Sequence, residues 1–438
     1  MKKNYLIWMA IIDLLFSACS TSKQIGRLAK NDILKNKSFT PAHTGISIYE
    51  PGTGKYWYNY QGDKYFVPAS NTKLATCYAA MKYLGDSLVG VRYIETSDTL
   101  IVIASGDPTF LHPDFSSQPV FNFLKNTNKS IFINTSEWKE HRWGSGWSWD
   151  DYNDDYAAER SAMPAYGNIL RLGGSLNNLK FSPGYFKNDV HVDYGLDKNL
   201  YPGATRRDIA GNNFMVTETS ANNHYTETPF YTGDDVLEGL LTDTLHKPVF
   251  LISYTGNYYK STGEKEIHSQ PVDTLLKILI HRSDNFFAEQ SLLMVSDRLL
   301  RVMNDEQVID TLLKTDFKDL PQKPYWVDGS GLSHYNLFSP QDFVAILNKM
   351  KNEFGIERIK NILPTGGTGT LSNYYKAERG YIFAKTGTLS GVVALSGFLY
   401  TKKNKLVIFS VLVNNHHTNG TNIRRAVEKF IEEVRDKK

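Results

Sequence analysis

In Pro68-Ala69-Ser70-Asn71-Thr72-Lys73-Leu74-Ala75-Thr76, Ser70 stands three residues before Lys73 at the predicted start of a helix. Residues at positions i and i+3 lie on one face of a helix, so the ammonium of Lys73 can reach the hydroxyl of Ser70. Apolar residues with helical spacing follow, and Pro68 precedes, which places Ser70 near the first turn. Free backbone N–H groups at this end of a helix favour a developing oxyanion. If burial removes the proton from Lys73, the lysine can act as a base toward Ser70.

The same Ser-x-x-Lys spacing also occurs at Ser20/Lys23 and at Ser136/Lys139, so the tetrapeptide alone has little weight. Neither of these pairs opens an apolar helix. A helix-capping serine beside a solvated lysine remains the alternative interpretation at Ser70.

A second motif, Ser283-Asp284-Asn285, lies between two apolar helical patterns. We expect a junction of two helices there, at which Ser283 and Asn285 can both point inward.

A third motif, Lys385-Thr386-Gly387-Thr388, ends a β-branched and aromatic run and contains the only Lys-Thr-Gly of the chain. At a strand edge it offers a fixed charge, two hydroxyls and, at Gly387, room for close backbone approach. Ser-x-x-Lys, Ser-Asp-Asn and Lys-Thr-Gly together form a known signature of penicillin-binding proteins and class A β-lactamases.

With these motifs the chain resembles the class C low-molecular-mass penicillin-binding proteins, which are D-alanyl-D-alanine carboxypeptidases and endopeptidases. The resemblance extends from about the first predicted strand to the last. Further stretches that match the family are Ser105-Gly106-Asp107-Pro108, Gly146-Trp147-Ser148-Trp149-Asp150-Asp151, Asp328-Gly329-Ser330-Gly331-Leu332-Ser333, Leu363-Pro364 and Gly369-Thr370-Leu371.

Strand-like segments at both ends of the chain are predicted to share one antiparallel sheet. They are residues 45–49, 55–58, 381–385, 392–400 and 406–413. A closing helix carries an apolar stripe from Ile423 to Val434, with Thr421 or Asn422 as its cap. The resemblance implies the same α+β fold, a penicillin-binding-protein and serine β-lactamase-like domain whose antiparallel sheet is flanked by helices.

A large β-rich insertion is predicted because Ser283 follows Ser70 by 213 residues, whereas one small helical subdomain fills that gap in class A β-lactamases. The intervening sequence has mostly short strands and turns, with strands at residues 99–104, 130–135, 191–194, 213–218 and 249–254. We therefore expect a signal peptide at 1–18, a serine D,D-peptidase domain from 19–86 and 268–438, and inserted β-rich domain(s) at 87–267.

The N-terminus has the features of an export signal. Met1-Lys2-Lys3 precedes an apolar run, residues 5–18, that is too short to span a membrane. Phe16-Ser17-Ala18-Cys19 resembles a bacterial lipobox, which predicts an envelope or periplasmic lipoprotein anchored to the membrane through a lipid on Cys19. Plain cleavage and a soluble exported enzyme is the alternative. Only Cys77 remains beside Cys19, so no disulfide within the mature chain is expected and a buried apolar role suits it.

The composition argues against a nucleic-acid partner. The net charge of +3 is spread over 49 basic and 46 acidic residues, with no basic cluster among aromatics, so no nucleic-acid partner is expected. The pair His416-His417 has no spaced acidic or cysteine partner, so we expect no metal and no cofactor.

The resemblance implies a role for each matching residue in cleaving peptidoglycan stem peptides and in reacting with β-lactam inhibitors. Ser70 attacks the carbonyl of the penultimate D-alanine and Lys73 accepts its proton. Ser283 relays a proton to the leaving amine, and Asn285 holds the substrate amide.

The Lys-Thr-Gly-Thr strand is implied to bind the substrate's carboxylate end. Lys385, Thr386 and Thr388 bind the carboxylate or sustain the positive field, Gly387 permits close approach, and the backbone N–H groups of Ser70 and Thr388 form the oxyanion hole.

Asp151 is a further candidate for substrate binding. The run Trp147-Ser148-Trp149-Asp150-Asp151 sets two carboxylates beside large aromatic surfaces, which suits the ammonium of a diamino residue in the stem peptide. The alternative is a structural loop in which the tryptophans pack and the aspartates cap a turn.

Two other functions stay open at this level. A β-lactamase or esterase of the same fold would share the motifs, although no clear deacylation base is present. A non-catalytic envelope binding protein should have lost a motif residue, and none is lost.

Overall fold

The computed structural model describes residues 22–175, 178–193, 205–217, 224–252 and 263–437. The predicted signal peptide and the predicted lipidation site Cys19 lie outside these residues. Across the described ranges, no helix is both long enough and apolar enough to cross a membrane.

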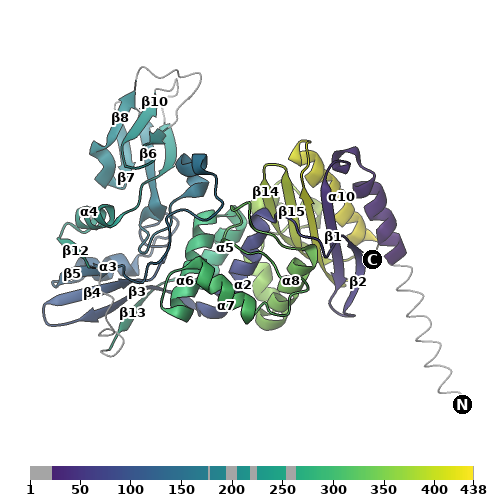
Figure 1. The fold of residues 1–438 in the computed structure, drawn as a ribbon, viewed down its shortest axis with the longest axis horizontal. Coiled ribbons are helices and arrows are strands. Elements are labelled where there is room, and N and C mark those ends of the chain that lie inside the picture. Colours follow the sequence, from purple (N-terminus) through teal and green to yellow (C-terminus); the bar gives the residue numbers. More distant parts are fainter. Residues whose placement is uncertain (1–21, 176–177, 194–204, 218–223, 253–262, 438) are drawn as a thin grey trace, which may run out of the picture.

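Strands from both ends of the chain form one five-stranded antiparallel sheet, as predicted. The strands are β1 His43–Glu50, β2 Lys55–Tyr60, β14 Ile382–Leu389, β15 Val392–Tyr400 and β16 Leu406–Asn414. Their order is β14-β15-β16-β1-β2 (Figure 1). His43 of β1 pairs with Asn414 of β16, so the first strand lies directly beside the last. β14, which carries Lys-Thr-Gly-Thr, is an edge strand.

Both faces of this sheet are buried, and β16 shows why. Successive side chains of a strand point to opposite faces. Ile408 and Leu412 join the core on one face, whereas Phe409 and Val411 join the core on the other. Burial on both sides accounts for the nearly unbroken apolar sequence of this strand.

The helix α10, Gly420–Asp436, covers one face with its predicted apolar stripe. Its N-cap is Asn419, whose side chain accepts a hydrogen bond from the backbone N–H of Thr421. The predicted cap at Thr421 or Asn422 is therefore wrong. Asn419 still has extended backbone angles and the helix begins at the next residue, so the cap stands earlier than the sequence pattern indicated.

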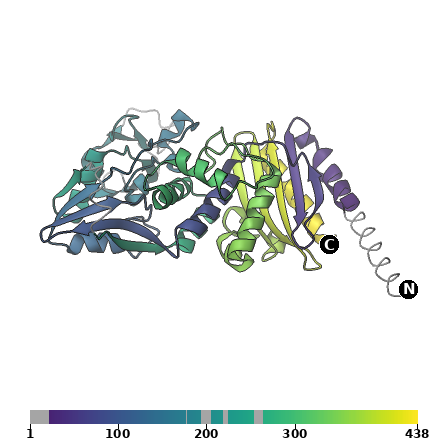
Figure 2. The same ribbon diagram turned by 60° about the horizontal axis from the view of Figure 1, so that its bottom comes forward.

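A layer of helices covers the opposite face and separates the sheet from the rest of the molecule (Figure 2). They are α2 Lys73–Tyr83, α5 Val272–Arg282, α6 Asn285–Leu300, α7 Asp305–Lys314, α8 Pro340–Phe354 and α9 Ile356–Ile362. α2 lies at the centre, where every residue from Lys73 to Met81 is buried. Cys77 is fully buried in this helix, in agreement with the predicted apolar role.

Between α2 and α5 the chain builds a β-rich region beyond the helical layer (Figures 1 and 2). One sheet has the order β12-β5-β4-β3-β13, and two three-stranded sheets have the orders β11-β6-β7 and β8-β10-β9. The strands are β3 Ser87–Glu95, β4 Thr99–Ala104, β5 Ser130–Asn134, β6 Ile169–Ser175, β7 Asn178–Ser182, β8 Val190–Asp193, β9 Thr205–Arg207, β10 Phe214–Thr217, β11 His224–Pro229, β12 Val249–Ile252 and β13 Lys265–Pro271. β13 pairs with β3 and continues directly into α5.

The predicted strands of this region are present, with ends 194, 218 and 253–254 lying outside the described residues. Two helices were not predicted: α3 Pro119–Asn126 and α4 Asp234–Leu245. α3 has eight residues, about two turns, which is too short for a sustained periodic pattern. α4 does carry helix signals, with acidic residues in its first turn and buried Leu240, Leu241 and Leu245.

Candidate active site

Ser70 and Lys73 meet where α2 begins. Residues Ala69–Thr72 form a 3-10 turn directly ahead of the helix. Ala69 has a positive φ of 48°, a backbone region that residues with a side chain rarely adopt. Lys73 Nζ donates a hydrogen bond to Ser70 Oγ at 2.9 Å. The two residues of the predicted pair are thus in direct contact.

Lys73 is fully buried and makes two further hydrogen bonds. Its Nζ donates to Asn285 Oδ1 at 2.6 Å and to the carbonyl oxygen of Ser330 at 2.7 Å. Burial lowers the pKa of Lys73 to about 8, opposed in part by the carboxylates of Asp328, Glu289 and Asp284. A lysine with this pKa is neutral in a useful fraction of molecules near neutral pH, and it can then accept a proton from the hydroxyl beside it.

Ser283 lies at the junction of α5 and α6, with a positive φ of 61° at the end of α5. Asp284 caps α6 by accepting a hydrogen bond from the backbone N–H of Phe287 at 2.8 Å. This tight junction presents Ser283 and Asn285 to the same side, next to Ser70.

Lys385 contacts the second hydroxyl. Its Nζ donates to Ser283 Oγ at 2.8 Å and to the carbonyl oxygen of Thr386 at 2.6 Å. Burial, together with the charge of Lys73, lowers the pKa of Lys385 well below its ordinary range. Burial is thus the main cause of the lowered pKa at both amines, and at Lys385 the charge of Lys73 adds to it.

Gly387 lets β14 pack against the Ser70 turn. A Cβ atom at Gly387 would lie 2.8 Å from the carbonyl oxygen of Pro68 and 3.2 Å from the Cβ of Ala69. The first contact is shorter than a Cβ atom tolerates and the second is tight, so a side chain here would push the two segments apart. The glycine of the motif is therefore required for the close approach that the sequence predicted.

The two threonines of the motif lie next to Arg424 of α10. Thr388 Oγ1 accepts a hydrogen bond from Arg424 Nη2 at 2.9 Å. Thr386 lines a small pocket that Arg424 also lines. Successive side chains of a strand point to opposite faces of the sheet. Thr386 and Thr388 therefore share one face of β14, and the side chain of Lys385 lies on the other face.

An open cleft of about 470 Å³ brings five of the predicted residues together. Ser70, Asp151, Ser283, Asn285 and Thr388 line it, whereas Lys73 and Lys385 lie buried beside its hydroxyls. Its other lining residues are Ser148, Tyr156, Gly331, Leu332, His334, Leu389 and Ser390. The arrangement joins a nucleophile, a buried amine, a second hydroxyl with its own amine, and an amide, which suits acyl transfer.

Asp151 reaches the cleft from the inserted region, in the short 3-10 helix Trp149–Asn153. Loss of solvent raises the pKa of its carboxyl, and Asp150 and Asp154 add to this effect. Trp149 is 75% exposed, whereas Trp147 is partly buried, so only one of the two tryptophans packs as the structural-loop alternative requires. Trp147 Nε1 donates to Asp328 Oδ2 at 3.0 Å and thereby ties this segment to the loop after α7.

Comparison with known protein families finds one family that matches the chain. The D-Ala-D-Ala carboxypeptidase 3 (S13) family matches residues 28–225 and 263–434, which is most of the sequence. The chain belongs to this family. S13 membership confirms the predicted class C low-molecular-mass penicillin-binding protein and a hydrolase that works through a serine.

Relatives cover most of this S13 chain. The D-alanyl-D-alanine carboxypeptidase of Actinomadura sp. (strain R39) is 24% identical over 437 residues, which is 88% of this chain and 80% of the relative. The D-alanyl-D-alanine carboxypeptidase DacB of Haemophilus influenzae is 23% identical over 417 residues, 82% of this chain and 83% of the relative.

Solved structures confirm the predicted fold. Penicillin binding protein 4 (dacB) from Haemophilus influenzae matches with a TM-score of 0.74 at 20% identity, covering 94% of this chain and 99% of that one. The Bd0816 predatory endopeptidase from Bdellovibrio bacteriovorus matches with a TM-score of 0.51 at 15% identity, covering 90% and 94%. The predicted activity, serine D,D-carboxypeptidase or D,D-endopeptidase action on peptidoglycan, agrees with the family and is preferred over the β-lactamase, esterase and non-catalytic alternatives.

Sequence reasoning missed three groups of the S13 site. Ser330 binds Lys73 through its carbonyl, Glu289 accepts a hydrogen bond from the backbone N–H of Ser330, and the carbonyl of Tyr156 accepts one from Asn285 Nδ2 at 2.9 Å. Of these three residues only Ser330 could have been suspected from the sequence. It lies in the stretch 328–333, which resembles the family but was given no role in catalysis.

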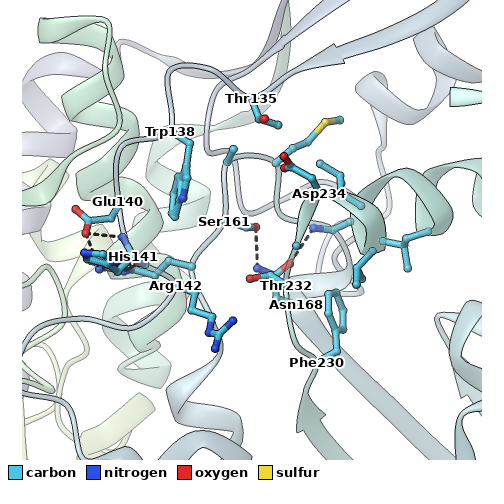
Figure 3. Close-up of a pocket in the computed structure, with 18 of the residues that line it drawn as sticks. Thr135, Trp138, Glu140, His141, Arg142, Ser161, Asn168, Phe230, Thr232 and Asp234 are labelled. Carbon is cyan, nitrogen blue, oxygen red and sulfur yellow. Dashed lines mark hydrogen bonds and ion pairs between the residues drawn. The ribbon is translucent and has the colours of Figure 1, made fainter. Parts of the chain in front are cut away.

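A second cavity, about 560 Å³, lies within the inserted region (Figure 3). Glu140, His141 and Arg142 line one side, and Phe230, Thr232 and Asp234 line the other (Figure 3). None of the residues predicted to be catalytic lines this cavity.

Proposed function

We propose that this S13 enzyme cleaves D-alanyl peptide bonds of peptidoglycan through an acyl-enzyme on Ser70. The observation that carries the proposal is the 2.9 Å contact between Ser70 Oγ and the buried Nζ of Lys73, whose pKa is lowered to about 8. Lys73 takes the hydroxyl proton while Ser70 attacks the carbonyl of the penultimate D-alanine. The C–N bond then breaks, and water later hydrolyses the ester.

Ser283 delivers the proton to the leaving amine in this mechanism. Its contact with Lys385 at 2.8 Å supports the role, because a buried amine beside the hydroxyl can replace the proton that Ser283 gives up. Asn285 has one amide hydrogen bonded to the carbonyl of Tyr156, so its second amide hydrogen is available to the substrate amide.

The oxyanion hole consists of the backbone N–H groups of Ser70 and Thr388. The packing of Gly387 against Pro68 supports this assignment, since it brings β14 next to the Ser70 turn. Lys385, Thr386 and Thr388 bind the substrate carboxylate or maintain the positive field around it, with Arg424 as an additional nearby cation.

Asp151 binds the free ammonium of the diamino residue that precedes D-alanine. Its place in the cleft beside Tyr156 and its partly desolvated carboxyl support this role. The enzyme acts in the cell envelope after export, attached through a lipid on Cys19, and family membership supports the envelope location.

The test is digestion of purified cross-linked muropeptides by the parent protein and by Ser70→Ala. Release of free D-alanine identifies carboxypeptidase action, and conversion of dimers to monomers identifies endopeptidase action. Both products should be absent with Ser70→Ala. Equal product formation by the variant would disprove the assigned nucleophile.

A further inference from the structure

Arg160 lies at the centre of a buried ion network between the inserted region and the helical layer. Its side chain is 1% exposed and forms ion pairs with Asp305 of α7 at 2.6 Å, Glu140 at 3.2 Å and Glu289 of α6 at 3.3 Å. It also donates to the backbone carbonyl oxygens of His141 and Trp143. The planar guanidinium has enough donors to hold several groups at once.

This network continues to the amine of Lys73 in two steps. Glu289 Oε1 accepts a hydrogen bond from the backbone N–H of Ser330 at 2.7 Å. The carbonyl oxygen of the same residue, Ser330, accepts the hydrogen bond from Lys73 Nζ at 2.7 Å. Arg160 is therefore ion-paired with Glu289, Glu289 is hydrogen-bonded to the Ser330 peptide, and that peptide is hydrogen-bonded to Lys73.

A second contact from the same inserted segment reaches Lys73 through Asn285. Asn285 Oδ1 accepts from Lys73 Nζ at 2.6 Å, while its Nδ2 donates to the carbonyl oxygen of Tyr156. Tyr156 stands four residues before Arg160. Of the three groups that bind Lys73 Nζ, two are thus anchored by residues 156–160.

We propose that Arg160 is a positioning residue for the catalytic base. Through Glu289 and the Ser330 peptide, the inserted region then fixes the position of the Lys73 amine. The proposal rests on the role proposed above for Lys73. It also gives the insertion a second function besides carrying Asp151, because the segment that ends at Arg160 fixes the geometry of proton transfer.

The charges around Lys73 set the pH dependence of acylation, which a purely structural role of Arg160 and Glu289 would leave unchanged. Asp328, Glu289 and Asp284 raise the pKa of Lys73. Lys385 lies on the other side of the site, and burial together with the charge of Lys73 lowers its pKa. Burial raises the pKa of Glu289 itself to about 8, with Asp328 adding to the effect and Arg160 opposing it, so the charge of Glu289 acts on Lys73 mainly in the upper part of the range from pH 6 to 9. Glu289→Gln keeps the side-chain shape and removes this charge, which raises the pKa of Lys73. The pKa of Lys73 should therefore fall, and the rise of the acylation rate with pH should move to lower pH.

A matched control is available in Arg92 of β3. Arg92 is also buried, 4% exposed, and pairs with a carboxylate of α6, Asp297, as well as with Glu137 and Glu264. It joins the inserted region to the same helix, but among the described residues none of its ion pairs or hydrogen bonds reaches Ser330 or Lys73. Loss of either arginine leaves buried carboxylates unpaired, which is destabilising in both cases.

The experiment compares the parent with Glu289→Gln, Arg160→Met and Arg92→Met. For each, the rate of acylation by a fluorescent penicillin is measured from pH 6 to 9, together with the thermal unfolding midpoint. We expect Arg160→Met to acylate about ten- to a hundredfold more slowly than Arg92→Met, since small misplacements of catalytic groups have effects of this size. Glu289→Gln, which is the milder change, should fold and show the shift to lower pH.

Equal slowing by Arg160→Met and Arg92→Met would overturn the proposal, because the effect would then be general loosening of the inserted region. A folded Glu289→Gln with the parental rate and pH profile would overturn it as well, even if Arg160→Met fails to fold. Failure of the proposed function is a separate result, since the parent protein itself would then carry no penicillin on Ser70.

Discussion

Replacing Lys73 by arginine tests the base directly. Arginine keeps the positive charge but does not lose its proton in proteins. The pKa of Lys73 falls from 10.5 to about 8 on burial. At pH 7 this raises the neutral fraction from about 0.03% to roughly 9%, about 300-fold, because each pKa unit changes the ratio tenfold.

Lys73→Arg removes this neutral fraction, so acylation should fall by about a thousandfold or more at pH 7. The parent rate should rise with pH and level off above about 8, where Lys73 becomes neutral. Stopped-flow mixing with a fluorescent penicillin measures both effects, and circular dichroism checks folding. Since the site is fully buried and arginine is larger, Lys73→Met serves as a second variant and should show the same loss.

Near-parental acylation by either folded variant would refute the assignment of Lys73 as the base. A parent profile that is flat between pH 6 and 9 would contradict the lowered pKa.

Three other substitutions give distinct outcomes. Asp151→Asn should lower kcat/KM about tenfold on peptides with a free side-chain amine, about 1.4 kcal/mol, and leave penicillin acylation nearly unchanged; equal loss on both substrates would return Asp151 to a structural role. Gly387→Ala should slow acylation about tenfold or more, measured with penicillin, because its Cβ would lie 2.8 Å from the carbonyl oxygen of Pro68; an unchanged rate would show that this close approach is unimportant. Cys19→Ala should abolish labelling by radioactive palmitate in cells, and absence of label from the parent would rule out the lipid anchor.

The sequence predicted best what depends on short spacing and on strand patterns. Ser70 and Lys73 are three residues apart, so the geometry of one helical turn brings them into contact, and the alternating cores beside β16 follow from its continuous apolar sequence. The resemblance placed Ser283 and Lys385, which are 102 residues apart, in one site, but it did not predict the contact between them.

Long-range backbone contacts could not be predicted in this way. Ser330 and Tyr156 act through carbonyl groups, which every residue has, so their side chains do not indicate the contacts, and only the family match of its stretch pointed to Ser330. Arg160 and Glu289 are 129 residues apart, and only the packing of the inserted region on α6 brings them together. Strand alternation predicts that Thr386 and Thr388 share one face of β14, but it does not predict that Arg424 of α10 lies beside them.

The central claim is that Ser70 carries the acyl group. Its most direct test is mass spectrometry of proteolytic peptides after reaction with penicillin. The account predicts one adduct, on the peptide that contains Ser70, and none in Ser70→Ala. An adduct on Ser136, or a Ser70→Ala protein that still reacts covalently, would contradict it.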